Sequence, residues 1–131
     1  MDENKQKTIL IVDDDTFLLN MYVTKFQKAG YEVNTARSGA EVLKKLEEGY
    51  RPNIMLLDVV LPGMDGIELL KEIQMKKLAD RTIFVMFTNQ GGGEEIEQAK
   101  KLGVSDYIIK ASLVPSEIVS KVLEIVGRKN S

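Results

Sequence analysis

Apolar residues concentrate in five short runs, separated by segments with helical periodicity. The runs 8–12, 54–57 and 83–87 contain no charged residue, which is typical of strands buried on both faces of a parallel sheet. The run 31–36 alternates apolar and polar positions, as expected of a half-exposed edge strand. With the run 106–109, the pattern predicts five strands.

A helical pattern follows each expected strand. Ser38 with Glu41, and Asp65 with Glu68, are spaced as capping boxes, and Pro115 suits the first turn of the last helix. The side chains expected to face the core are Leu18, Met21, Tyr22 and Phe26, then Val42, Leu43 and Leu46, then Ile67, Leu70 and Ile73, then Ile96, Ala99 and Leu102, and finally Ile118, Val119, Val122, Ile125 and Val126.

Five strand-then-helix units predict an α/β fold, with a parallel sheet covered by helices on both sides. The chain has 131 residues, which suits one domain with a substantial core. We expect a single domain over 8–127, with flexible tails at 1–7 and 128–131 and no second domain.

The composition excludes several kinds of chemistry. There is no Cys and no His, which removes thiol nucleophiles, thiolate zinc sites and the commonest general base. The 18 Lys and Arg residues nearly balance the 20 Asp and Glu residues, so the net charge of -2 gives no reason to expect a nucleic-acid partner. The apolar runs are too short to span a bilayer and the first residues contain no apolar signal region, so we expect a cytoplasmic protein without a membrane partner.

Four of the five expected strands end in a polar residue able to do chemistry: Asp13, Asp58, Thr88 and Lys110. The carboxyl ends of parallel strands share one edge of the sheet, where ligands bind in open α/β folds. A solvated strand end accounts for any one of these residues, but chance accounts poorly for all four. We interpret Asp15 as a helix cap rather than a member of this set.

The charges of these residues suggest a phosphoryl site. Asp13, Asp14 and Asp58 would repel one another unless a hard cation joined them, and a few carboxylates with water suit Mg²⁺. Lys110 offers a mobile positive charge and Thr88 a hydroxyl donor. Such a cradle stabilises a transferring phosphoryl group, and Asp58 is the carboxylate that would become an acyl phosphate.

Three segments and one further residue carry a family resemblance: ILIVDDD at 9–15, LLDVVLPGMDG at 56–66, GVSDYIIK at 103–110, and Thr88. Together they resemble the receiver domains of two-component response regulators, over about Thr8 to Val126. The resemblance implies a flavodoxin-like, doubly wound sheet of order 2-1-3-4-5 with five helices. It also implies a single-domain response regulator that receives a phosphoryl group from a sensor histidine kinase or histidine phosphotransfer protein and then switches a surface for an unknown target protein.

The same resemblance implies a role for each residue of the site. The metal site would consist of Asp13, Asp14, Asp58 and the backbone carbonyl of Val60. Asp58 would be the phosphoacceptor, Thr88 and Lys110 would contact the phosphoryl group, and Tyr107 would change rotamer with the switch. The chain would catalyse only its own phosphorylation and dephosphorylation, so it would not be an enzyme in the usual sense.

Three features depart from the family pattern. Ala111 follows Lys110, where the family usually has proline in a cis peptide; without proline the cis form costs roughly 2.5–4 kcal/mol, which favours a trans bond. Asn89 stands where the family commonly has Ala after the threonine, Gln90 follows it, and both side chains could reach the phosphoryl pocket. The run Gly91–Gly93 is unusually permissive.

Three other functions fit the sequence less well. An aspartate-nucleophile phosphatase begins with a similar acidic strand end, but it needs a further acidic pair after its lysine, and only Glu117 and Glu124 follow Lys110 here. A receiver-like interaction module that is never phosphorylated usually lacks an acid or the lysine. A nucleotide-binding flavodoxin-like protein would need a phosphate loop after its first strand, and the triple glycine is not there. The sequence names neither the kinase nor the pathway nor the target.

Overall fold

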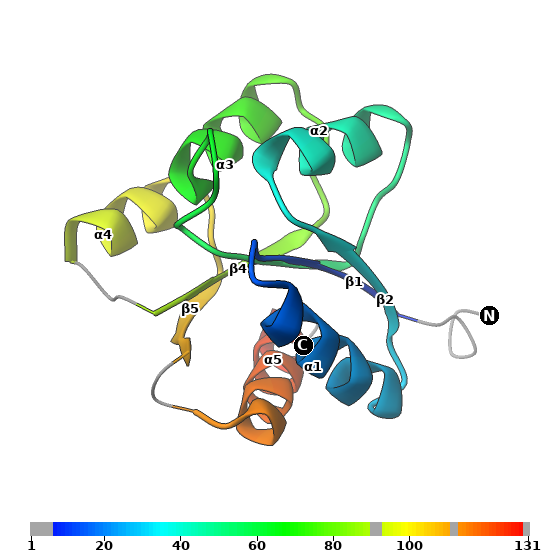
Figure 1. The fold of residues 1–131 in the computed structure, drawn as a ribbon. Coiled ribbons are helices and arrows are strands. Elements are labelled where there is room, and N and C mark those ends of the chain that lie inside the picture. Colours follow the sequence, from blue (N-terminus) through cyan, green and yellow to red (C-terminus); the bar gives the residue numbers. More distant parts are fainter. Residues whose placement is uncertain (1–6, 90–92, 111–112, 130–131) are drawn as a thin grey trace.

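Five parallel strands alternate with five helices in this computed structural model, which describes residues 7–89, 93–110 and 113–129 (Figure 1). The elements are β1 (Thr8–Val12), α1 (Thr16–Lys28), β2 (Glu32–Ala36), α2 (Gly39–Glu47), β3 (Ile54–Leu57), α3 (Gly66–Met75), β4 (Ile83–Thr88), α4 (Gly93–Lys101), β5 (Asp106–Ile109) and α5 (Pro115–Lys129). The strands form one sheet in the order β2-β1-β3-β4-β5. The predicted flavodoxin-like fold is confirmed.

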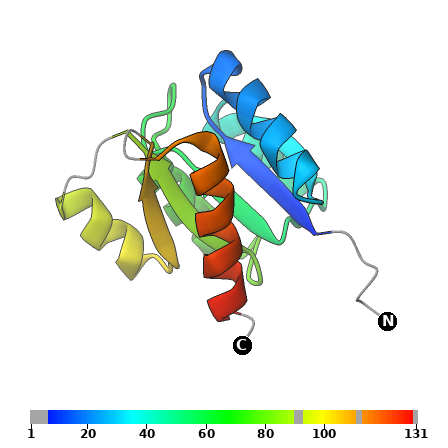
Figure 2. The same ribbon diagram turned by 90° about the horizontal axis from the view of Figure 1, so that it is seen from below.

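Two helical layers cover the sheet. The helices α1 and α5 lie on one face, and α2, α3 and α4 lie on the other (Figures 1 and 2). Successive residues of β1 serve opposite layers because side chains alternate along a strand. Ile9 and Ile11 pack in a cluster with Phe26 of α1, whereas Leu10 and Val12 belong to the cluster under α2 and α3.

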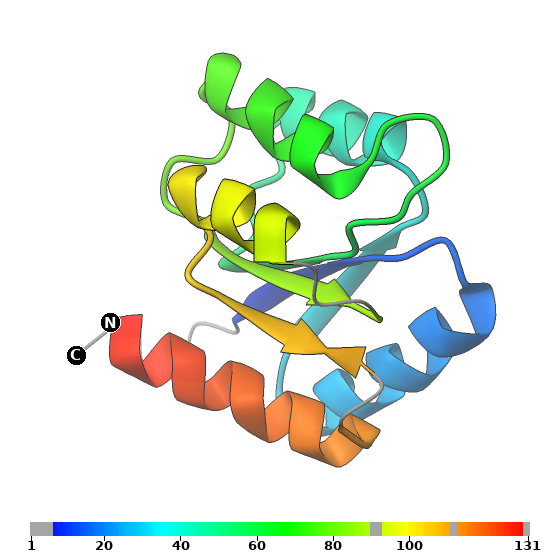
Figure 3. The same ribbon diagram turned by 90° about the vertical axis from the view of Figure 1, so that its left-hand side faces the viewer.

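The central strand β3 sets the position of the site. Its four residues are completely buried, as the uncharged run predicted. Leu57 pairs with Val12 of β1 on one side and with Met86 of β4 on the other. Because β1, β3 and β4 run in register, the residues that follow these strands lie together at one edge of the sheet. The end of β5 lies at the same edge (Figure 3).

The helix starts show how local sequence fixes the turns at this edge. Asp65 and Glu68 form the predicted capping box at α3, in which each side chain accepts from the other's backbone N–H. At α2 only half of the predicted box forms. Ser38 accepts from the Glu41 N–H, but the Glu41 carboxylate accepts from the N–H of Arg37, one residue before the cap.

The core-facing side of α1 differs from the prediction. Leu19, Tyr22 and Phe26 are buried, whereas Leu18 and Met21 are only half-buried. Spacings of three and four residues occur in both sets, so the sequence pattern did not distinguish them.

The last helix, α5, extends past the expected end of the domain. It continues to Lys129, two residues beyond 127. Across the described ranges, no helix combines the length and apolar character needed to cross a bilayer.

Candidate functional site

A cavity of about 240 Å³ opens at the carboxyl edge of the sheet. It is lined by Asp13, Asp14, Asp15, Leu18, Asp58, Val60, Thr88, Asn89 and Lys110. All six residues predicted for the catalytic and metal sites are among them. The sheet therefore brings together side chains that lie as much as 97 positions apart in the sequence.

The ammonium of Lys110 joins two carboxylates inside this cavity. Its Nζ lies 2.9 Å from Oδ2 of Asp58 and also donates to Oδ2 of Asp13. All three residues are almost fully buried, with exposed fractions of 7%, 7% and 1% for Lys110, Asp58 and Asp13. Removing Lys110 would leave two buried carboxylates without a compensating charge, so both carboxylates depend on the lysine.

An aromatic pair supports Lys110 from the side of α1 and α5. The Lys110 Nζ lies 4.9 Å from the centre of the Phe87 ring, close enough for a cation–π interaction. The Tyr22 ring meets Phe87 edge-on at 5.0 Å between centroids. Phe87 was not among the predicted site residues, although its position directly before Thr88, at the end of a buried strand, was a usable signal.

Burial and charge act in opposite directions on Asp58. Burial raises the pKa of its carboxyl group above the usual range, and the nearby Asp13 adds to the effect. The Lys110 ammonium and the Val60 N–H, which is 3.1 Å from Oδ1, oppose the increase but do not cancel it. For Lys110, burial lowers the pKa, but its two carboxylate partners outweigh burial and raise it. The charged form of Lys110 is therefore favoured in this site, whereas the charged form of Asp58 is disfavoured.

The acidic residues fit a divalent metal. One carboxylate oxygen from each of Asp13, Asp14 and Asp58 can be chosen so that all three lie within 4.8 Å of one another. Each carboxylate oxygen accepts in two directions, so the contacts from Lys110 and the Val60 N–H leave room for a ligand bond. Asp14 is exposed at the rim, and oxygen ligands of this kind suit Mg²⁺.

The neighbouring Asp15 behaves as predicted. Its side chain accepts from the N–H of Leu18 at 3.1 Å and caps α1. Its own backbone N–H donates to Oδ1 of Asp13 at 3.0 Å, which holds the Asp13 carboxylate in orientation.

Gly66 lets the helix α3 approach the phosphoacceptor candidate. A Cβ at this position would lie 2.4 Å from the carbonyl oxygen of Asp58 and 3.0 Å from the Cα of Val59. The Gly66 N–H donates to the Val59 oxygen at 2.8 Å, which closes the loop after β3. A close approach between backbone segments leaves no mark in a single sequence, so this role of Gly66 could not be predicted.

The remaining predicted residues lie around the end of β4 and on β5. Thr88 is the buried last residue of β4 and Asn89 is exposed at the cavity wall. Tyr107 is half-buried on the edge strand β5, paired with Met86, and packs against the cluster on the α2, α3 and α4 side. The expectations for Gln90, Gly91 and Gly92, and for the peptide between Lys110 and Ala111, lie outside the described residues.

A doubly wound sheet of this order, with an acidic cavity bridged by a lysine at its carboxyl edge, defines a class of α/β signalling domains. The family model of the response regulator receiver domain matches residues 9–123. The chain belongs to this family, whose members are the receiver modules of two-component systems and are generally non-catalytic signalling domains.

Relatives and solved structures agree with this assignment. The chemotaxis protein CheY of Thermotoga maritima is 35% identical over 114 residues, which cover 86% of this chain and 92% of that protein. The crystal structure of a CheY-like receiver domain protein from Methanospirillum hungatei has a TM-score of 0.86 at 32% identity and covers 96% of this chain and 98% of that one.

Longer regulators match as well. The alkaline phosphatase synthesis transcriptional regulatory protein PhoP of Bacillus subtilis is 35% identical over 124 residues, which are 93% of this chain but 49% of PhoP. The chain thus spans about half the length of PhoP.

Proposed function

We propose that this chain accepts a phosphoryl group on Asp58 and thereby switches a protein-binding surface. The observation that supports the proposal most strongly is the contact of one buried lysine, Lys110, with both Asp58 and Asp13. A structural ion pair would need one carboxylate. This site has two carboxylates around one ammonium and a third acid at the rim. The excess negative charge suits the binding of a metal cation, beside which a phosphoryl group can be added.

The reaction follows from the groups present. An oxygen of Asp58 attacks the phosphorus of a phosphohistidine on a histidine kinase or phosphotransfer protein, the P–N bond breaks, and an acyl phosphate forms on Asp58. Lys110 is released from part of its pairing with Asp58 and balances charge on the phosphoryl oxygens. The Thr88 hydroxyl at the end of β4 donates to the same group.

Asp13, Asp14 and Asp58, with the carbonyl of Val60, would hold Mg²⁺. The metal supplies positive charge that offsets repulsion between the carboxylates and the phosphoryl group. The chain itself orients the Asp13 carboxylate through the Asp15 N–H and the Asp58 carboxylate through the Val60 N–H.

The output surface lies on the side of β5. Drawing Thr88 towards a phosphoryl group moves the segment after it, gives Tyr107 room to turn inward, and remodels the face formed by α4, β5 and α5. A target protein would bind there, over Glu94–Lys101, Tyr107 and Ser116–Lys121. The unit that carries this function is 8–127.

The test is phosphorylation by acetyl phosphate with Mg²⁺, followed by intact-mass spectrometry. The unaltered chain should gain one acid-stable, base-labile phosphoryl group and Asp58→Asn should gain none. Asp15→Asn is the matched control, because asparagine also caps helices and the residue lines the same cavity; it should still be phosphorylated. Equal labelling of the Asp58→Asn variant, or no labelling of the unaltered chain, would contradict the proposal.

A further inference from the structure

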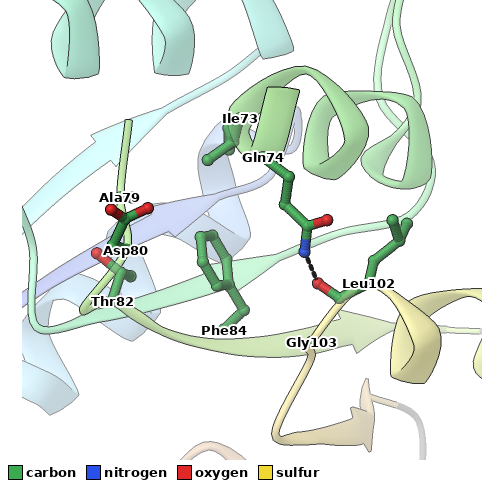
Figure 4. Close-up of a pocket in the computed structure, with 8 residues that line it drawn as sticks. All are labelled: Ile73, Gln74, Ala79, Asp80, Thr82, Phe84, Leu102 and Gly103. Atoms are coloured by element: carbon green, nitrogen blue, oxygen red, sulfur yellow. Dashed lines mark hydrogen bonds between the residues drawn. The ribbon is translucent and has the colours of Figure 1, made fainter. Parts of the chain in front are cut away.

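A second hollow lies at the opposite end of the sheet from the acidic cavity, near the start of β4. Its volume is about 320 Å³, within the range of small-molecule sites. Its walls come from the last turn of α3, the connection from α3 to β4, the start of β4 and the end of α4 (Figure 4). The lining residues are Ile73, Gln74, Ala79, Asp80, Thr82, Phe84, Leu102 and Gly103.

The inner part of this hollow is apolar. Ile73, Ala79 and Phe84 are 2%, 5% and 8% exposed, and the Phe84 ring lies in the middle of the lining residues (Figure 4). Small residues keep the space open. A Cβ at Gly103 would meet only the side-chain nitrogen of Gln74, at 3.5 Å, and Ala79 brings no more than a methyl group. The hollow opens to solvent, so its apolar inner part offers a contact surface for a ring from outside.

A side-chain bridge fixes one wall of the hollow. The amide of Gln74 donates to the carbonyl oxygen of Leu102, which ties the end of α3 to the turn after α4 (Figure 4). The opposite wall is also fixed, because the Thr82 hydroxyl donates to the Pro52 carbonyl at 2.8 Å. Both walls are therefore held before any ligand arrives, which lowers the ordering cost of binding.

The charge around the hollow favours a cation. Among the eight lining residues, all of which the structure describes, Asp80 has the only formal charge. The last turn of α3 contains no basic residue, and the ammonium of Lys76 just beyond it pairs with Glu47 at 3.1 Å. The negative end of the α3 dipole thus adds to the Asp80 carboxylate. Lys77 and Arg81 do not line this hollow; they line an adjoining one of about 440 Å³, which shares Asp80 and Thr82 with it.

We propose that this second hollow binds a small aromatic amine. The ring would lie against Phe84, between Ile73 and Ala79, and the ammonium would reach Asp80. The walls that Gln74 and Thr82 hold in place would limit the ligand to a single ring with a short side chain. Neither the site nor its ligand depends on phosphorylation of Asp58.

The experiment titrates the full ¹⁵N-labelled chain with 2-phenylethylamine and, in parallel, with the uncharged 2-phenylethanol. Saturable shifts of the Gln74, Phe84 and Gly103 amides are expected with both, at a several-fold lower concentration for the amine. Shifts centred on Asp13 and Asp58 would mean that the amine binds the acidic cavity instead, and would overturn the proposal. So would the absence of any saturable shift.

Three variants separate the ring from the charge. Ala79→Leu fills the hollow and should weaken both probes about tenfold. Asp80→Asn, which removes only a charge, should abolish the preference for the amine, and it decides the matter if Ala79→Leu fails to fold. Asp106→Asn is the control, since that carboxylate pairs with Arg128 away from the hollow, and its preference for the amine should persist. An unchanged preference in Asp80→Asn would contradict the assignment.

Discussion

Lys110 and Asp58 are 52 positions apart in the sequence, yet 2.9 Å separates the ammonium nitrogen of one from a carboxylate oxygen of the other in the interior of the domain. The same ammonium also binds Asp13, so one positive charge serves two buried negative charges. The negative charge of the two carboxylates is therefore only partly balanced by the lysine. That imbalance makes the site responsive to added positive charge and to the removal of a carboxylate.

Asp58→Asn should stabilise the metal-free protein near neutral pH. Burial raises the pKa of Asp58 above 3.8, so the folded chain holds this proton more tightly than the unfolded chain and loses stability as pH rises through the window above 3.8. The variant escapes this loss and should gain on the order of 1 kcal/mol at pH 7, with the difference vanishing at low pH, where both forms are neutral. Urea unfolding in EDTA across this pH range measures it. A variant less stable than the unaltered chain at pH 7 would show that the Lys110 contact dominates.

Mg²⁺ should raise the free energy of unfolding through binding to the folded chain. At ten times the dissociation constant the expected gain is about 1.4 kcal/mol. Asp14→Asn should remove most of the gain, because Asp14 is one of three acids whose oxygens lie within 4.8 Å of one another. Asp15→Asn should keep it, since Asp15 caps α1. Melting curves with and without millimolar Mg²⁺ test both variants, and a melting temperature indifferent to Mg²⁺ would count against the metal site.

Gly66→Ala should destabilise the domain and impair phosphorylation. Its new Cβ would lie 2.4 Å from the Asp58 carbonyl oxygen, so α3 or the loop after β3 must shift, at a cost of about 1–3 kcal/mol. Gly127→Ala is the matched control in α5, where a Cβ meets nothing within 4 Å. It should stabilise by about 0.5–1 kcal/mol, because alanine is the better helix former. Equal effects of the two substitutions would refute the close-approach argument.

Thr88→Ala should uncouple phosphorylation from the output surface. With beryllofluoride as a phosphate mimic, hydrogen exchange of the unaltered chain should slow in 88–95 and change around Tyr107. The variant should lose the change at Tyr107 while Asp58 still accepts a phosphoryl group. Thr24→Ala is the control, because its hydroxyl donates to the Asn20 carbonyl within α1. Protection limited to Asp58 and its neighbours in the unaltered chain would mean that no switch passes through this segment.

The fold could be predicted because the strand runs, the helical spacing of apolar residues between them and the residues at the strand ends were clear in the sequence. The uncharged run that became β3 is buried on both faces, and the edge position of β2 followed from its alternation. The meeting of Asp13, Asp58, Thr88 and Lys110 followed in turn, since a parallel sheet has one carboxyl edge. Their roles stay predictions.

Features that depend on three-dimensional proximity could not be predicted. The contact that only Gly66 permits and the bridge from Gln74 to Leu102 each join segments whose distance the sequence does not encode. The choice of Leu19 over Leu18 on α1 depended on the rotation of the helix against the sheet. A rotation of about 100° separates neighbouring positions on a helix, and several apolar residues allowed more than one orientation.

The distribution of the site along the chain has a consequence for biosynthesis. Asp13 emerges early from the ribosome, whereas Lys110, which binds it, comes 97 residues later. A nascent chain that has exposed Asp58 but not Lys110 still lacks the β5 edge strand and the cation between the two carboxylates. Under the proposed function, we expect partial translation products and fragments that end before Lys110 not to accept a phosphoryl group, because they lack the lysine that would balance its charge.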